Sequence, residues 1–190
     1  DTLDAEVAQA IDAAMEMLVR AGATIVPIEV PEVREFEAVF GRIVPVELID
    51  ILGRDRVRQN LDVFDPITKA RFSAVLDSAP ADLGAARAQQ VALRDAVDAR
   101  GAQCDAWITP ATPLVPGPLA SYATLESALA WNRRALRNTR PGNVFDQCGV
   151  SLPLPRTALP VGLQVLCPAR QDAKLLGIAH AMETALNSPE

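Results

Sequence analysis

The segment from Asn143 to Glu183 constrains the fold most strongly, because it contains two short apolar runs followed by a helical apolar pattern. Residues 143–153 and 159–167 contain the runs, and the six residues 155–160 link the two strands expected within them. A link this short favours antiparallel neighbouring strands, since parallel strands need a crossover of about a dozen residues or more. A core-facing helical stripe follows from Asp172, at Leu175, Ala179, Met182 and Leu186. The segment therefore predicts strand, loop, strand and helix.

The first 100 residues predict helices with one strand among them. A capped helix ends near Gly22, and the β-branched run 24–30 predicts a strand whose Pro27 favours an edge position. The helical spacing of 31–52 is interrupted by Pro45, which should break or kink the segment and so favours two helical pieces. Further helices are expected after the Asp65-Pro66 turn and from Ser78 to Arg100.

A short strand is predicted at 106–109, directly before a loop with four prolines and a glycine in nine residues, 110–118. Ligands of open α/β sheets bind at the carboxyl ends of strands, so Thr109 to Thr112 is a candidate binding site by position. Thr124 caps a further helix, which we expect to end at Pro141-Gly142. Four arginines suit the negative end of its dipole: Arg133, Arg134, Arg137 and Arg140.

The overall pattern predicts one α/β body over residues 1–190, with a mixed sheet flanked by helices. A net charge of −6 argues against direct binding to nucleic acid or to an anionic membrane and favours a small-molecule or protein partner. The sequence contains neither a run of about 20 apolar residues nor the basic start of a secretion signal, so a cytoplasmic protein is expected.

The reactive residue types predict no metal site and no cofactor. Three scattered cysteines and one histidine offer no ligand spacing, and a Gly-rich nucleotide loop is absent. Cys148 and His180 allow a nucleophilic pair on paper, whereas packing of Cys148 beside Gly149 is the alternative. Gly162 predicts a bulge or close backbone contact, and Gln164 a buried amide with a structural hydrogen bond.

A cluster of basic residues, Arg54, Arg56 and Arg58, leaves two interpretations open. It is either a phosphate-binding site or a solvated helix face. No Gly-rich loop accompanies it, which favours the solvated face.

Several segments together resemble the amidase signature family, hydrolases of carbon–nitrogen amide bonds. They are Asn143, Ser151, Pro153, 159–164, Asp172, 175–176, Ala179 and Glu183, with weaker likeness at 105–113 and 22–31. The likeness is diffuse from Glu32 to Gly101. In the best-matched stretch, Asp146 replaces the family's common glycine and Cys148 its frequent proline.

The resemblance implies serine hydrolysis in which a lysine acts through a bridging serine on a nucleophilic serine. The sequence contains no Ser-Ser or Gly-Gly pair, and its two lysines lack Gly- and Ser-rich neighbours, so no catalytic residue is assigned. The chain is expected to be the C-terminal portion of an amidase, inactive alone, forming part of the sheet and one wall of the pocket for a small-molecule amide. The expected pocket residues are Thr109, Pro110, Thr112, Asn143 and Asp146.

Two other functions remain open, and the amide substrate is not predicted. One is a fragment of the glutaminase-type component of a transamidosome, similar to the A-subunit of glutamyl-tRNA amidotransferase, which would require partner subunits. The other is an α/β interaction or ligand-binding module without chemistry. If the chain was cut from a larger sheet, its uncovered apolar face predicts self-association.

Overall fold

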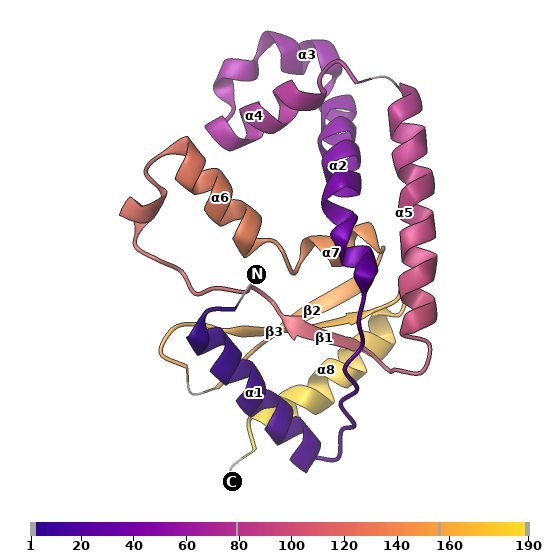
Figure 1. The fold of residues 1–190 in the computed structure, drawn as a ribbon, viewed down its shortest axis with the longest axis vertical. Helices are drawn as coiled ribbons and strands as arrows, with labels where there is room; N and C mark the ends of the chain where they lie inside the picture. The colour runs from indigo at the N-terminus through magenta and orange to yellow at the C-terminus, as the bar shows by residue number, and fades with distance from the viewer. Residues whose placement is uncertain (1–2, 79, 156, 189–190) are drawn as a thin grey trace.

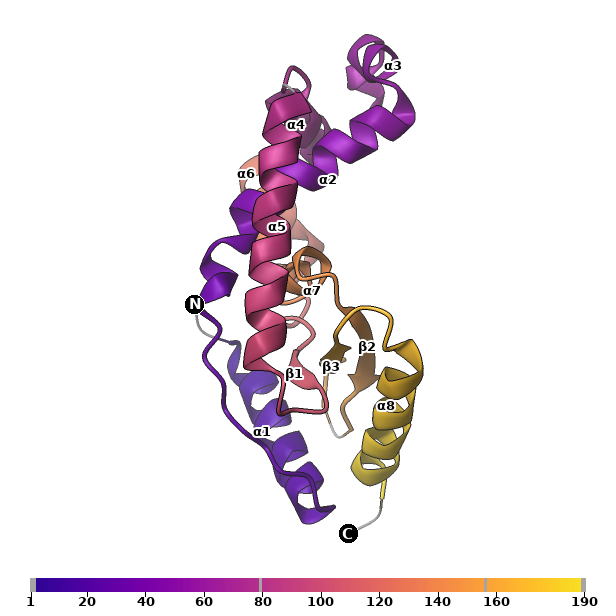
Figure 2. The same ribbon diagram turned by 90° about the vertical axis from the view of Figure 1, so that its right-hand side faces the viewer.

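The computed structural model describes residues 3–78, 80–155 and 157–188. Within these ranges a small antiparallel sheet lies toward one end of an elongated molecule, and helices extend from it toward the other end (Figure 1, Figure 2). The predicted α/β class, with helices flanking a sheet, is confirmed.

The sheet has the strand order β1-β3-β2 and is antiparallel throughout. Its strands are β1 (Trp107–Pro110), β2 (Cys148–Pro153) and β3 (Gly162–Cys167). The predicted pairing of the last two strands is confirmed, with Val150 opposite Val165. β3 is central and almost wholly buried, which explains its nearly continuous apolar sequence.

One face of the sheet packs against the first and last helices. Helix α1 (Ala5–Arg20) and helix α8 (Asp172–Leu186) lie together here, and α8 crosses β2 and β3 (Figure 2). Alternate residues of β3, Leu163, Val165 and Cys167, join the buried residues of both helices in one core. The predicted stripe of α8 is confirmed, since Leu175, Ala179 and Leu186 are buried and Met182 packs beside them.

The remaining helices form the other end of the molecule. Helix α2 (Phe36–Leu52) packs along α5 (Pro80–Arg100), while α3 (Arg54–Gln59) and α4 (Pro66–Val75) lie at their far end (Figure 1). Helix α6 (Leu125–Ala135) faces α4, and the short α7 (Arg140–Val144) contacts α2 and α5. Short 3-10 turns occur at η1 (Pro31–Arg34), η2 (Leu61–Val63) and η3 (Leu119–Tyr122).

Capping residues begin two of these helices, and the cap at Thr124 was predicted. The Asp65 carboxylate accepts hydrogen bonds from the backbone N–H groups of Ile67 and Thr68, which starts α4. Thr124 and Ser127 form a reciprocal capping box at the start of α6. The cap predicted around Ser78 for α5 includes residue 79, which lies outside the described residues.

Three local predictions are wrong. Residues 24–30 do not form a strand; Ile25 and Val26 are exposed, and no described strand lies beside this segment to complete a ladder. Helix α2 continues through Pro45 instead of breaking there. The Pro45 ring is buried, and the carbonyl that loses its helical partner belongs to exposed Gly41, where water can replace the lost bond.

The third error concerns Pro141-Gly142, which lies inside α7 instead of ending the preceding helix. Pro141 occupies the first turn of α7, where its missing N–H costs nothing. Helix α6 ends at Ala135, so Arg140 begins a new helix and does not neutralise the end of α6.

Candidate functional site

The sheet face opposite α1 and α8 carries the candidate site. Antiparallel register places Trp107 opposite Leu166 and Thr109 opposite Gln164. Paired residues project to the same side of a sheet, and residues two apart on one strand share a face. All four side chains therefore lie on the face turned toward α5 and α7.

A buried amide joins the strands to the segment before α7. Gln164 is 7% exposed, and its Nε2 donates to the hydroxyl of Thr109 at 3.2 Å and to the backbone carbonyl of Asn138 at 3.0 Å. The Asn138 side chain in turn donates through Nδ2 to the Pro110 carbonyl at 2.8 Å. The structural role predicted for Gln164 is confirmed, and the network fixes the Thr109 hydroxyl in place.

A cavity of about 280 Å³ lies over this network. Apolar side chains from both ends of the molecule form most of its wall: Val30, Val33, Phe36, Val97, Trp107, Pro141, Phe145 and Leu166. Its polar groups are Thr109, Arg137, Asn138 and Gln147. An apolar wall with a few fixed polar groups is the ordinary form of a small-molecule site.

The five predicted pocket residues are divided among three places. Thr109 lines the cavity, and Pro110 ends β1 beside it with its carbonyl held by Asn138. Thr112 lies in the proline-rich loop, where its hydroxyl donates to the Leu114 carbonyl at 2.9 Å. Asn143 in α7 and Asp146 just after it are exposed and do not line this cavity.

Asp146 has a backbone φ of 55°, in the left-handed region. Glycine adopts this conformation without a steric penalty, and aspartate tolerates it better than most residues. This conformation gives a physical reason why aspartate can stand here in place of the family's common glycine, because both residues suit the same turn.

Charged side chains cluster near this turn, at the end of α5. Arg94 pairs with Asp95 at 2.9 Å and approaches Asp146 at 3.9 Å. Asp98 lies nearby with Oδ1 buried and without a hydrogen-bond partner among the described residues. Burial raises the pKa of Asp98; Arg94 opposes the rise, and the negative charges of Asp95 and Asp146 add to it.

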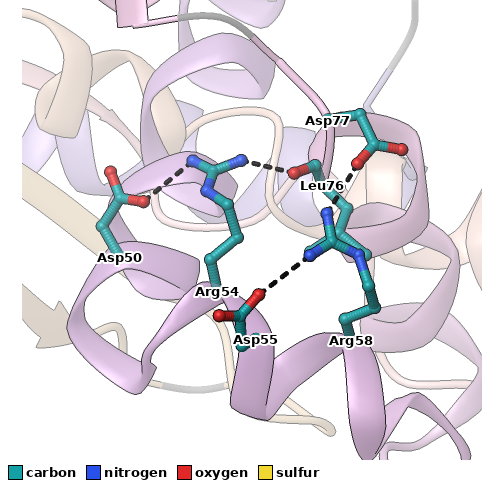
Figure 3. A network of polar contacts seen from close by, with 6 residues as sticks. All are labelled: Asp50, Arg54, Asp55, Arg58, Leu76 and Asp77. Carbon is teal, nitrogen blue, oxygen red and sulfur yellow. Dashed lines mark hydrogen bonds and ion pairs between the residues drawn. The ribbon is translucent and has the colours of Figure 1, made fainter.

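Two of the three arginines of α3, Arg54 and Arg58, bind acidic and carbonyl groups of the protein itself (Figure 3). Arg54 contacts Asp50 at 2.8 Å and the carbonyl of Leu76. Arg58 bridges Asp55 at 3.1 Å and Asp77 at 2.8 Å. These contacts fasten α3 to α2 and to the end of α4, so they support the helix-face interpretation of the cluster over phosphate binding.

Within the described part of the chain, the other reactive side chains form no catalytic group with one another. Lys69 pairs with Asp62, and Lys174 with Asp105 at 3.3 Å. His180 is exposed, while the Cys148 thiol donates to the carbonyls of Cys167 and Pro168. Among the described residues no group of His, Cys, Asp or Glu is arranged to hold a metal ion. Nor does any described helix have the length and apolarity required to cross a membrane.

The three cysteines are free, and Cys148 lies directly opposite Cys167 in the sheet. Cys167 is buried, whereas Cys104 and Cys148 are half-buried. Burial raises the pKa of the Cys167 thiol, which disfavours the nucleophilic thiolate. A Cβ on Gly162 would lie 2.5 Å from the Ser151 hydroxyl, so the close contact at this glycine is with a side chain and not with the backbone as predicted.

Most of the cavity's polar lining was not predicted from the sequence. Asn138 and Gln147 lie on either side of α7. Because the sequence predicted one long helix ending at Pro141-Gly142, it did not predict that these residues face the cavity. Trp107 was detectable, because it is two residues before Thr109 on the same strand and must share its face. The residues contributed by η1 and α5 carried no comparable signal, since they reach the cavity only through tertiary packing.

Comparison with known proteins identifies the class to which this fold and site belong. The family model described as Amidase matches residues 1–176. A crystal structure of an amidase superimposes with a TM-score of 0.83 at 25% identity, over 97% of this chain and 43% of that one. The chain belongs to the amidase family, the amidase-signature hydrolases that act on carbon–nitrogen bonds.

The relatives within this family carry different names. The chain is 33% identical over 204 residues to 2-amino-5-chloromuconic acid deaminase of Comamonas testosteroni, covering 98% of this chain and 41% of that protein. It is 31% identical over 202 residues to the A-subunit of glutamyl-tRNA(Gln) amidotransferase from Mycobacteroides abscessus, covering 92% of this chain and 40% of that subunit. The chain thus spans about two fifths of the length of these relatives.

Proposed function

We propose that the chain is the C-terminal portion of an amidase domain and forms one wall of its acyl-group pocket. In this proposal a longer protein cleaves a small amide, and residues outside 1–190 supply the nucleophile and base. The observation that carries it is the apolar cavity over Thr109, at the end of a strand of an amidase-family fold. The ion-paired state of both lysines supports a base located elsewhere.

The five pocket residues have two separate roles in this proposal. Thr109 and Pro110 form the floor, because Gln164 and Asn138 hold the hydroxyl and the strand end in place. Thr112 shapes the proline-rich loop through its bond to Leu114. Asn143 in α7 and Asp146 just after it are exposed, and in this proposal they belong to the rim that the rest of the enzyme covers. The apolar wall would bind the acyl group.

Ammonia release tests the assignment of catalysis. The chain alone should release no ammonia from a panel of aliphatic and aromatic amides, whereas the longer protein encoded by the surrounding reading frame should hydrolyse at least one. Turnover by the isolated chain would overturn the expected inactivity. Failure of the longer protein on amides, both alone and with amidotransferase partners, would favour a binding module instead.

A matched pair of variants in the longer protein tests the pocket wall. Thr109→Val removes the hydroxyl that faces the cavity, and we expect KM to rise about tenfold, the effect of one lost hydrogen bond. Thr184→Val, on an exposed site of α8, is the control and should leave KM unchanged. Equal KM values for the two variants, with equal melting temperatures, would remove Thr109 from the pocket.

A component of an amidotransferase is the second candidate function, favoured by the 31% identity to the A-subunit from Mycobacteroides abscessus. Such a component would release ammonia from glutamine and require partner subunits to transfer it to glutamate on a transfer RNA. Amide hydrolysis by the longer protein without partners would decide for a free amidase. Dependence on added partners would decide for the amidotransferase.

The remaining proposals concern assembly and compartment. β1 and β2 each pair only with β3 within the described sheet, which leaves one edge of each strand unpaired. We therefore expect the isolated chain to self-associate, and a monodisperse monomer by light scattering would contradict this. The facing free thiols of Cys148 and Cys167 support a reducing, cytoplasmic setting.

A further inference from the structure

A second cavity, of about 270 Å³, lies between α2, α4, α6 and α7, outside the site described above. Three guanidinium groups line it, from Arg71, Arg133 and Arg140, and the one carboxylate in the lining is that of Glu37. The cavity thus concentrates positive charge in a chain whose net charge is −6. Such an excess in a concave site favours an anion.

Arg140 is the most deeply placed of the three cations. It is 8% exposed, and its Nε is buried without a hydrogen-bond partner among the described residues. Its remaining contacts are long: Nη1 lies 3.4 Å from a Glu37 oxygen, and Nη2 lies 3.3 Å from Oδ1 of Asn132. Well-formed charge-assisted bonds measure about 2.7–2.9 Å, so the guanidinium is only weakly satisfied by the protein.

Arg71 competes with Arg140 for the same acceptor. Its Nη2 donates to Oδ1 of Asn132 at 2.5 Å, which brings two positively charged groups to one neutral oxygen. Burial lowers the pKa of Arg140, as do the charges of Arg71 and Arg133, while Glu37 opposes them. The protein therefore bears an electrostatic cost here that a bound anion would relieve.

The rest of the lining describes the body of the ligand. Phe40 stacks under Arg140, with the guanidinium carbon 5.3 Å from the ring centroid. The other wall residues are mostly apolar: Pro45, Ala74, Val75 and Leu129. Inorganic phosphate has no apolar surface to place against them, whereas a carboxylate on a hydrocarbon ring matches both parts. A planar carboxylate also suits the fork of a guanidinium group.

We propose that this cavity binds a small monocarboxylate with a flat apolar body, whose carboxylate contacts Arg71 and Arg140 and whose ring contacts Phe40 and Leu129. The site uses none of the five residues assigned to the amide pocket. It does not rest on the proposed amidase activity, since binding can be measured on the isolated chain.

Calorimetric titration of the 190-residue chain with benzoate at low salt tests the proposal. Benzoate should bind in the millimolar range or tighter, and benzamide, its neutral analogue, about tenfold more weakly or worse. Inorganic phosphate should also bind more weakly than benzoate. Phosphate binding more tightly would show an anion site of a different class, and equal binding of benzoate and benzamide would show an apolar cavity without charge recognition. Either result would overturn the proposal, as would an absence of binding.

Three variants locate the site. Arg71→Met should weaken benzoate binding about tenfold, because one charge-assisted contact is lost. Arg133→Met changes an exposed residue and should leave the fold intact, so it serves as a second cavity variant. It should weaken benzoate binding less than Arg71→Met does. Arg20→Met makes the same charge change on α1 and should leave binding unchanged. Unaltered binding in both cavity variants would place the anion elsewhere and refute the assignment.

Discussion

The sheet end and the helical end of the molecule are held together in different ways. At the sheet end, α1, β1–β3 and α8 share one continuous buried core. At the helical end, α2–α5 divide their buried residues between two smaller groups, one near α7 and one between α3 and α4. Arg54 and Arg58 form ion pairs with Asp50 and Asp77, which join the segments that carry the second group (Figure 3).

This difference predicts unequal local stability. Burial of apolar surface is the dominant favourable term in folding, whereas ion pairs exposed to solvent contribute about 1 kcal/mol or less. The α3–α4 end should therefore open more readily than the sheet, and it also exposes Ile51 and Val63. A region held by exchangeable surface contacts can change in sequence without loss of the fold, which fits its diffuse family likeness.

The largest expected effect separates the two cores directly. Leu163→Ala removes a side chain with 0% exposure from the sheet core and should lower the free energy of unfolding by about 4 kcal/mol. Leu76→Ala, in the small α3–α4 group, should cost about 2 kcal/mol because that group can relax around the cavity. Urea denaturation measures both, with exposed Leu176→Ala as the control. Equal losses of unfolding free energy for the two variants would contradict the difference proposed between the two cores.

The next effect concerns the joint between the two ends. Gln164→Met preserves side-chain size but leaves the Asn138 carbonyl and the Thr109 hydroxyl without their donor. We expect a loss of about 2 kcal/mol and faster hydrogen exchange in α7. Exposed Gln103→Met is the matched control. Unchanged exchange in α7 would show that the amide does not couple the sheet to the helices.

A smaller effect tests the ion pairs of the helical end. Arg54→Met should cost about 1 kcal/mol, because it also removes the donor to the Leu76 carbonyl, and Arg58→Met about 0.5 kcal/mol. Added salt should reduce both losses. Arg20→Met, at the exposed pair with Glu16, is the control and should cost about 0.3 kcal/mol. Losses that do not respond to salt would mean that packing of the arginine stems holds α3.

The smallest effect depends on pH and on the pKa of Asp98. Because this pKa is raised in the folded state, the stability associated with the protonated form is fully present below the ordinary value of about 4. It is lost as the pH rises through the raised value. Asp98→Asn should therefore stabilise the protein at pH 7 by about 0.5 kcal/mol or less, given solvent screening.

Thermal denaturation between acidic and neutral pH measures this gain, which should disappear at the acidic end. Exposed Asp12→Asn, on α1, provides a control with the same chemical change. A gain for Asp98→Asn that is independent of pH would show that the Asp98 carboxylate is not the cause.

The two ends also differ in how far the sequence predicted them. The two apolar runs and the short link between them predicted the strands and their pairing, and the helical spacing after Asp172 predicted the α8 stripe. Residues 24–30 are richer in β-branched residues than β3 is, but a strand requires a neighbour, and local composition does not reveal one. Pro45 and Pro141 were misjudged because the cost of a proline depends on burial and on its turn of the helix.

The candidate site was predictable only in part for a related reason. Thr109 follows from its position at a strand end, and it does line the first cavity. Val33, Val97 and Phe145 reach the same cavity from elements far apart in sequence. Arg140 was expected to stabilise a helix end, and its burial over Phe40 depends on the packing of α2 against α7. Convergence of this kind is a tertiary property without a local signature.

The left-handed turn at Asp146 has a consequence for how this loop can evolve. Only a few residues accept such a turn at low cost, chiefly glycine, asparagine and aspartate. Within that short list the side chain ranges from none, through a neutral amide, to a carboxylate, while the path of the main chain stays the same. A single-residue exchange here alters the charge of the surface beside α7 without redesigning its shape, so selection can tune it one step at a time.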